Sequence, residues 1–168
     1  MNNPVVITSR VGRPSAIETI LTAGFIAGCL DLLAAIIVYS VAMQRTTDTK
    51  LLQNIGKAAF GSSAFDSETS LALSGVGVHF FIAFSFAIFY FFIFPYIPFL
   101  KKQRIISGLL YGIFVWCIMN LAVLPLLHIA NIPVKWDSIV RGAVILMLCI
   151  GLPVSLIVSR YYILKEQR

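Results

Sequence analysis

Four long apolar runs, separated by short polar segments, constrain the fold of this chain more than any other feature. They cover about residues 17–43, 71–94, 105–129 and 139–159, and each is long enough to cross a lipid bilayer as an α-helix. Backbone polar groups find no water in hydrocarbon, so such a run adopts the helical form. The sequence therefore predicts an all-α polytopic membrane protein with four transmembrane helices, in a single membrane domain over residues 1–168. Ser15 and Glu18 form a capping-box pattern that predicts the start of the first helix.

A fifth, shorter segment lies between the first two runs, at about residues 49–65. Its apolar residues fall on one side of a helix, and the segment is too short to span a bilayer. We expect a short interfacial or re-entrant helix there. The residues that form this apolar side are Leu51, Leu52, Ile55, Ala59 and Phe60.

The charged residues indicate orientation and partner class. Of the residues, 59% are hydrophobic and only 12% are charged, and the basic residues cluster at the ends of the apolar runs, where they face lipid headgroups. The net charge of +6 therefore indicates the lipid bilayer, and not nucleic acid, as the partner. With four spans, one side of the membrane carries eight Lys and Arg residues and the other carries five, which predicts that both termini are cytoplasmic. The richer side holds Arg10, Arg13, Lys101, Lys102, Arg104, Arg160, Lys165 and Arg168; the poorer side holds Arg45, Lys50, Lys57, Lys135 and Arg141.

Three polar residues inside the apolar runs are candidates for a proton or solute site: Asp31, His79 and Asn120. An Asp at the centre of a transmembrane helix costs about 2.5–3.5 kcal/mol, so such a residue needs a reason to be there. At 1.5 Å per residue, Asp31 lies about 18 Å from the outer end of its run, and His79 and Asn120 lie about 12 Å from theirs. The three are therefore expected in one layer of the membrane.

Small residues and prolines indicate how the helices pack. Glycines one or two turns from Asp31 and His79, and a second pair in the third run, would let helices approach closely in lipid. These packing residues are Gly24, Gly28, Gly75, Gly108 and Gly112. Pro125 and Pro153 each predict a kink, because proline cannot donate the backbone hydrogen bond of a regular helix.

No catalytic motif, cofactor-binding pattern or metal-ligand spacing is present, so the sequence favours a protein that is not an enzyme, without cofactor or metal. Its three cysteines lie in apolar runs and form no C-x-x-C pair, which is typical of buried apolar residues.

The segments "GFIAGCLDLLAA", "GVGVHFFIAFSFAIFYFF" and "RIISGLLYGIFVWCIMNLAVLPLL", followed by a last helix that ends in basic residues, resemble the small uncharacterised bacterial proteins similar to YagU. The resemblance implies a four-helix protein of the bacterial inner membrane, with a suggested link to acid tolerance and no settled biochemistry. His79 falls on the histidine of that family's second span. Asn120 and Arg141-Gly142 fall where relatives can carry further histidines, so this chain departs from the pattern at both positions.

Two main hypotheses for function follow. In the first, Asp31, His79 and Asn120 form an intramembrane site for proton-linked handling of an ion or small solute, and the protein acts as a homo-oligomer because four helices enclose little volume. In the second, the protein is a non-catalytic interaction or assembly subunit for a membrane partner, and the polar cluster only fixes helix packing. An unassigned membrane enzyme is a third, weaker alternative.

Overall fold

A computed structural model describes residues 14–38, 48–61, 63–126 and 136–167 of the chain. The described part is helical, and four of its helices are long and apolar enough to cross a membrane: Ala16–Val38, Glu68–Tyr96, Arg104–Leu126 and Trp136–Glu166. The predicted all-α polytopic class is therefore confirmed. The fourth span is longer than the predicted 139–159, and the predicted ends at 39–43 and 127–129 lie outside the described residues.

The first helix, α1 (Ala16–Ala35), begins at the predicted cap. The Ser15 hydroxyl accepts a hydrogen bond from the Glu18 backbone N–H at 3.1 Å, and the Glu18 carboxylate accepts one from the Ser15 N–H at 2.6 Å. These two bonds satisfy donors that a helix start leaves without partners.

The second span combines α3 (Glu68–Ile93) with a 3₁₀ turn, η2 (Phe94–Tyr96), and is followed by the short α4 (Pro98–Lys102). The third comprises α5 (Arg104–Ile118), the π-helical η3 (Met119–Val123) and α6 (Leu124–Leu126). The fourth comprises α7 (Trp136–Leu146), the π-helical η4 (Met147–Gly151) and α8 (Leu152–Glu166).

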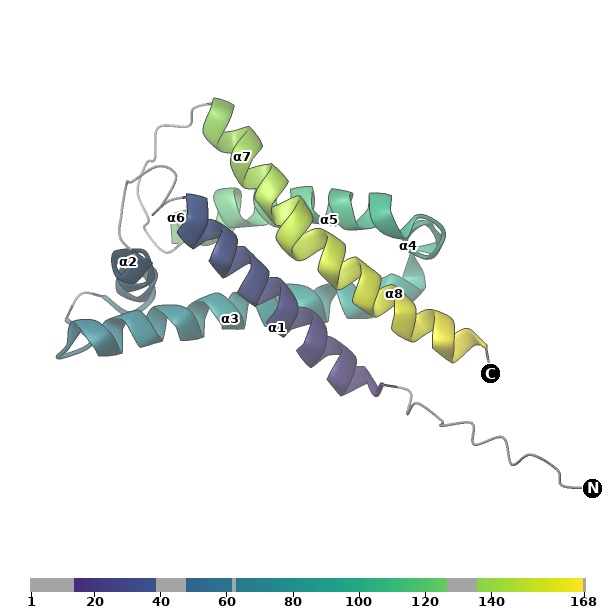
Figure 1. Cartoon of the computed structure of the whole chain (residues 1–168), viewed down its shortest axis with the longest axis horizontal. Helices are drawn as coiled ribbons and strands as arrows, with labels where there is room; N and C mark the ends of the chain where they lie inside the picture. Colours follow the sequence, from purple (N-terminus) through teal and green to yellow (C-terminus); the bar gives the residue numbers. More distant parts are fainter. Residues whose placement is uncertain (1–13, 39–47, 62, 127–135, 168) are drawn as a thin grey trace, which may run out of the picture.

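The spans alternate in direction, so the start of α1, the α4 turn and the end of α8 gather at one end of the molecule (Figure 1). α1 packs against α3, α8 and η4, and α5 packs against α7, η4 and α8. The core lies where α1, α3 and α8 meet, and it combines alanines of α1 with aromatic rings of α3 and valines of α8. Its fully buried members include Ala23, Ala27, Tyr90, Val154 and Val158.

Glycines form the closest contacts between α1 and α3. A Cβ added at Gly24 would lie 2.2 Å from the Phe84 ring, and one at Gly28 would lie 2.8 Å from the Phe80 ring. The absence of a side chain at both positions lets two phenyl rings of α3 lie directly on the backbone of α1, a close packing that stabilises helices in lipid.

The contact between α5 and η4 is between backbones. A Cβ at Gly112 would lie 2.3 Å from the Met147 Cα, and one at Gly151 would lie 2.1 Å from the Gly108 carbonyl oxygen. Gly108 and Gly112 therefore face a third glycine, Gly151, on the fourth span.

The π-helical segments η3 and η4 are each followed, after one residue, by a proline. The N–H of Leu124 bonds the carbonyl of Met119, and the N–H of Leu152 bonds that of Met147, so each bond reaches back five residues instead of four. Pro125 and Pro153 follow at once. A proline ring clashes with the carbonyl four residues earlier in a regular helix, and the wider π turn relieves that clash.

The short helix α2 (Asp48–Phe60) lies against the first turns of α3. In Figure 1, α2 is seen end-on whereas α3 lies along the page, so the two cross steeply. A Cβ at Gly75 would lie 2.0 Å from the Leu52 carbonyl oxygen, which shows how close the two backbones are. The helix ends at Phe60, earlier than the predicted 65, because Gly61 adopts a φ of 89° that terminates it.

Candidate functional site: the Asp31–His79 pair

Asp31 lies in the last third of α1, one turn beyond the buried Ala27 and Gly28. It is half-buried and interacts electrostatically with His79 of α3. The two side chains form no direct ion pair among the contacts of the described residues. Asp31 and His79 thus face the same α1–α3 contact from two helices, and we call them the Asp31–His79 pair.

The orientation of His79 follows from a hydrogen bond to the backbone of α1. Its Nε2 lies 2.9 Å from the carbonyl oxygen of Gly28. A carbonyl oxygen can only accept, so Nε2 carries the hydrogen of this bond. In the neutral imidazole, Nδ1 is then the nitrogen with a lone pair, and it is the atom that can take up a proton.

Aromatic rings enclose one side of this arrangement. The His79 ring contacts the Phe80 ring edge-on with centroids 5.6 Å apart, and Phe80 stacks on Phe25 of α1 at 5.8 Å. Gly28 therefore has two functions: its missing side chain admits the Phe80 ring, and its carbonyl anchors the imidazole.

A third side chain, Cys149 of η4, lies within electrostatic range of Asp31. The sequence alone predicts no role for this cysteine beyond packing. The sequence does indicate that the two residues lie at similar depth, because Cys149 is about 15 Å from the outer end of its predicted run, close to the value for Asp31. Depth alone does not give the direction of a side chain, and here η4 packs against α1 and brings Cys149 toward the pair.

Asn120 lies apart from the pair. It is exposed on η3, and its Nδ2 donates to the Trp116 carbonyl of its own helix at 2.8 Å. The structure does not bring Asn120 to Asp31 and His79. Its amide is bonded within the third span instead, at the start of the π-helical η3.

A second polar cluster, which the sequence does not predict, joins α3, α5 and α8. The Tyr90 hydroxyl donates to Ser155 at 2.8 Å and lies 3.1 Å from the Ser107 hydroxyl. Ser107 and Ser155 both donate to the Arg104 carbonyl, at 3.0 and 2.7 Å. These three buried hydroxyls, the hydroxyl cluster, bond one another and one backbone oxygen, so they cross-link three spans. Serines in apolar helices commonly bond their own backbone, and sequence spacing does not distinguish the two cases.

The described residues also bear on metal binding and disulfides. Within residues 14–38, 48–61, 63–126 and 136–167, no group of three or more His, Cys, Asp or Glu side chains is placed to hold a metal ion. Cys29, Cys117 and Cys149, all in the described part, are free thiols.

Comparison with known proteins gives a family without an assigned activity. No curated protein and no solved structure matches the chain. Residues 36–148 match a family described as "Protein of unknown function (DUF1440)". The matched range includes His79 and Asn120, begins after Asp31 and ends just before Cys149. Because the match covers more than half of the chain, the protein belongs to the DUF1440 family of proteins of unknown function.

Proposed function

We propose that this protein handles an ion or small solute in a proton-linked manner, with the Asp31–His79 pair as the proton site. The observation that carries the proposal is the pair itself: a carboxyl group on one apolar helix interacts with an imidazole on another, and a backbone carbonyl holds that imidazole by one nitrogen. Ionisable groups inside membrane spans are expensive, and they commonly mark ion paths and proton relays.

The chemistry of the pair is suited to a single proton. The Nε2 hydrogen is engaged by Gly28, so proton exchange at the ring uses Nδ1. Uptake at Nδ1 makes an imidazolium, which a neighbouring carboxylate stabilises, and uptake at Asp31 leaves both groups neutral. A proton can therefore bind at either residue of the pair, and the net charge of the pair between α1 and α3 then rises by one.

The proposal includes the setting of the site. The chain is a single membrane domain of the bacterial inner membrane, similar to the YagU-like proteins, with both termini cytoplasmic. Five described basic residues belong to α4, the start of α5 and the second half of α8, elements that meet near the start of α1 (Figure 1), which supports this orientation: Lys101, Lys102, Arg104, Arg160 and Lys165. Because four helices enclose little volume, a path for a solute is formed by a homo-oligomer.

The alternative function is a non-catalytic interaction or assembly subunit of a membrane complex. The hydroxyl cluster favours it, because those buried polar groups bond one another across three spans and so cross-link the helices. On this alternative the Asp31–His79 pair is a second cross-link of the same kind, and the exposed apolar side chains of α3, such as Leu73, Phe81 and Phe92, face a partner protein.

A proton-flux assay and an infrared titration together separate the two functions. Purified protein in vesicles that contain a pH-sensitive dye is subjected to an imposed membrane potential, and internal acidification is recorded. The Asp31 carboxyl stretch is followed against pH in the same vesicles. The test variants are Asp31→Asn and His79→Gln, and the control is Glu166→Gln, which changes a carboxylate at the exposed end of α8 into an amide.

We expect protein-dependent acidification that Asp31→Asn abolishes and Glu166→Gln leaves unchanged, in variants that remain folded by thermal unfolding. We also expect a pH-dependent carboxyl band that Asp31→Asn removes and His79→Gln displaces. If the Asp31 carboxyl band changes with pH but no proton flux is detected, the transport proposal is wrong and the pair is only a proton-binding site. Flux equal to that of empty vesicles, with no titrating carboxyl, would overturn the proton site and favour the structural alternative.

A further inference from the structure

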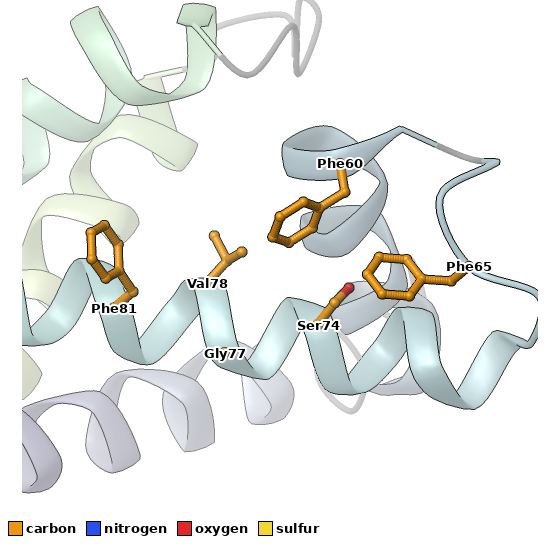
Figure 2. Close-up of a pocket in the computed structure, with 6 residues that line it drawn as sticks. All are labelled: Phe60, Phe65, Ser74, Gly77, Val78 and Phe81. Carbon is orange, nitrogen blue, oxygen red and sulfur yellow. The ribbon is translucent and has the colours of Figure 1, made fainter.

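A hollow on an exposed side of α3, beside α2, belongs to none of the clusters described above. Its volume is about 350 Å³, at the lower end of the range for small-molecule sites. Figure 2 shows its lining side chains on one side of α3, with α2 above them. The lining residues are Phe60, Phe65, Ser74, Gly77, Val78 and Phe81.

The lining offers an apolar surface and no polar group without a partner. Ser74 is its only hydroxyl, and this hydroxyl donates to the Leu71 carbonyl of its own helix at 2.7 Å. At Gly77 an added Cβ would meet no described atom within 4 Å, so the floor of the hollow is open. A polar solute would lose its hydration there without compensation, whereas a hydrocarbon chain would not.

The walls of the hollow are held in place by the packing of α2 on α3. The backbones touch at Gly56 and Gly75, and the Gln53 amide donates to the Glu68 carbonyl at 3.3 Å. Phe60 at the end of α2 contacts Phe65 edge-on, with ring centroids 5.7 Å apart. The hollow is therefore a preformed feature of the α2–α3 contact.

Two residues of opposite charge lie close in the chain to lining residues of the hollow. Lys57 lies three residues before Phe60, on the exposed side of α2, and Asp66 directly follows Phe65. Residues three apart on a helix are neighbours on its surface. Lys57 and Asp66 are exposed, and neither forms an ion pair among the described residues. One cationic and one anionic side chain without an ion pair among the described residues therefore lie within three residues of the apolar lining.

From this juxtaposition we propose that the hollow is a binding site for one zwitterionic aminophospholipid. An acyl chain lies along α3 from Phe65 toward Phe81, the Lys57 amine binds the lipid phosphate, and the Asp66 carboxylate binds the lipid ammonium. Charge-assisted hydrogen bonds to phosphate and to carboxylate are among the stronger polar contacts. The presence of both signs beside the lining distinguishes this headgroup from an anionic one, which Asp66 repels, and from a headgroup whose amine is methylated and cannot donate.

Native mass spectrometry of the full chain tests the site. Delipidated protein in detergent is mixed with equal amounts of phosphatidylethanolamine, phosphatidylglycerol and phosphatidylcholine that carry the same acyl chains, and the one-lipid adducts are compared. Gly77→Leu fills the floor of the hollow. Its matched control is Ser85→Leu, which adds a leucine at an exposed position eight residues further along α3, where the hydroxyl bonds only the Phe81 carbonyl. Lys57→Gln and Asp66→Asn remove one of these two charges each.

We expect a single phosphatidylethanolamine adduct in the wild type, at least about tenfold over the other two lipids, a ratio equivalent to one well-placed polar contact. Gly77→Leu should abolish this adduct and Ser85→Leu should keep it. Each charge variant should reduce the headgroup preference to about twofold or less. Equal adducts of all three lipids in the wild type, or an unchanged adduct in Gly77→Leu, would overturn the proposal. If Gly77→Leu instead converts a dimer into a monomer without loss of lipid, the hollow is an interface between two copies of this chain, and the proposal is wrong.

Discussion

Gly75→Ala tests the close contact between α2 and α3. The new methyl group would lie 2.0 Å from the Leu52 carbonyl oxygen and 3.2 Å from the Gly56 nitrogen, and both are backbone atoms. Ordinary contact begins near 3.4 Å, so α2 must withdraw by about 1.4 Å as a unit, since no side-chain rotation relieves the clash. Overpacking of this kind costs about 1–3 kcal/mol, and a clash of 2.0 Å with a backbone atom belongs in the upper half of that range. The better helix propensity of alanine returns about 1 kcal/mol.

The net loss of about 1–2 kcal/mol in stability should affect the docking of α2 on α3 and not the whole protein, because α2 can leave α3 while the four spans stay packed. Hydrogen–deuterium exchange of the protein in lipid nanodiscs measures this directly. Backbone amides of residues 51–60 should lose protection about 5–30-fold in Gly75→Ala, with little change in α1, α5 and α8.

Gly77→Ala is the matched control for this variant. It lies two residues further along the same helix, and its new methyl group would meet no described atom within 4 Å. Protection of α2 should therefore stay unchanged or rise slightly. Unchanged protection in Gly75→Ala, or an equal loss in both variants, would show that the close backbone contact does not hold α2 in place.

Three further variants test the packing and the polar contacts, with the free energy of unfolding measured by denaturation in mixed micelles. Gly151→Ala should lower it by about 1–3 kcal/mol, because the methyl group would lie 2.1 Å from the Gly108 carbonyl oxygen, and unchanged stability would contradict that contact. Tyr90→Phe should lower it by about 1 kcal/mol, because one donor of the hydroxyl cluster is lost, whereas Tyr96→Phe, at a residue that is 82% exposed, should change it by less than about 0.5 kcal/mol. His79→Leu should lower the free energy of unfolding by about 0.6–1.5 kcal/mol more than His79→Gln, because Gln keeps a donor for the Gly28 carbonyl. Equal effects would show that this hydrogen bond does not stabilise the fold.

The fold class could be predicted from the sequence because lipid permits few alternatives. A backbone without water must bond to itself, so each long apolar run has to be a helix, and Ser15 with Glu18 marks where the first one begins. The predicted ends of the spans were less accurate than the predicted fold class. α8 continues to Glu166 because its last turns carry aromatic and charged residues that suit the membrane interface, whereas apolar content alone ended the predicted span at 159.

Residue counting was enough to group Asp31 with His79 but did not give the direction of the Asn120 side chain. Counting residues from the span ends placed Asp31 and His79 in one layer, and the two interact. The same count also placed Asn120 in that layer, yet its side chain is exposed. The side of a helix that faces the bundle depends on the rotation of the helix about its axis. A π turn changes that rotation, and counting residues at a regular rise does not predict where a π turn occurs. Cys149, within η4, was missed for the same reason.

The π turn in the fourth span has a consequence for changes in chain length. A regular helix rotates by about 100° per residue, so the one residue that η4 accommodates in its wider turn sets the rotation of α7 against α8. Removal of a single residue from Met147–Gly151 would restore a regular turn and rotate α7 by about 100° about its axis, away from its present contact with α5. At this position a one-residue deletion is therefore a larger structural change than most substitutions. Among proteins of this family, the number of residues before Pro153 should matter as much as their identity.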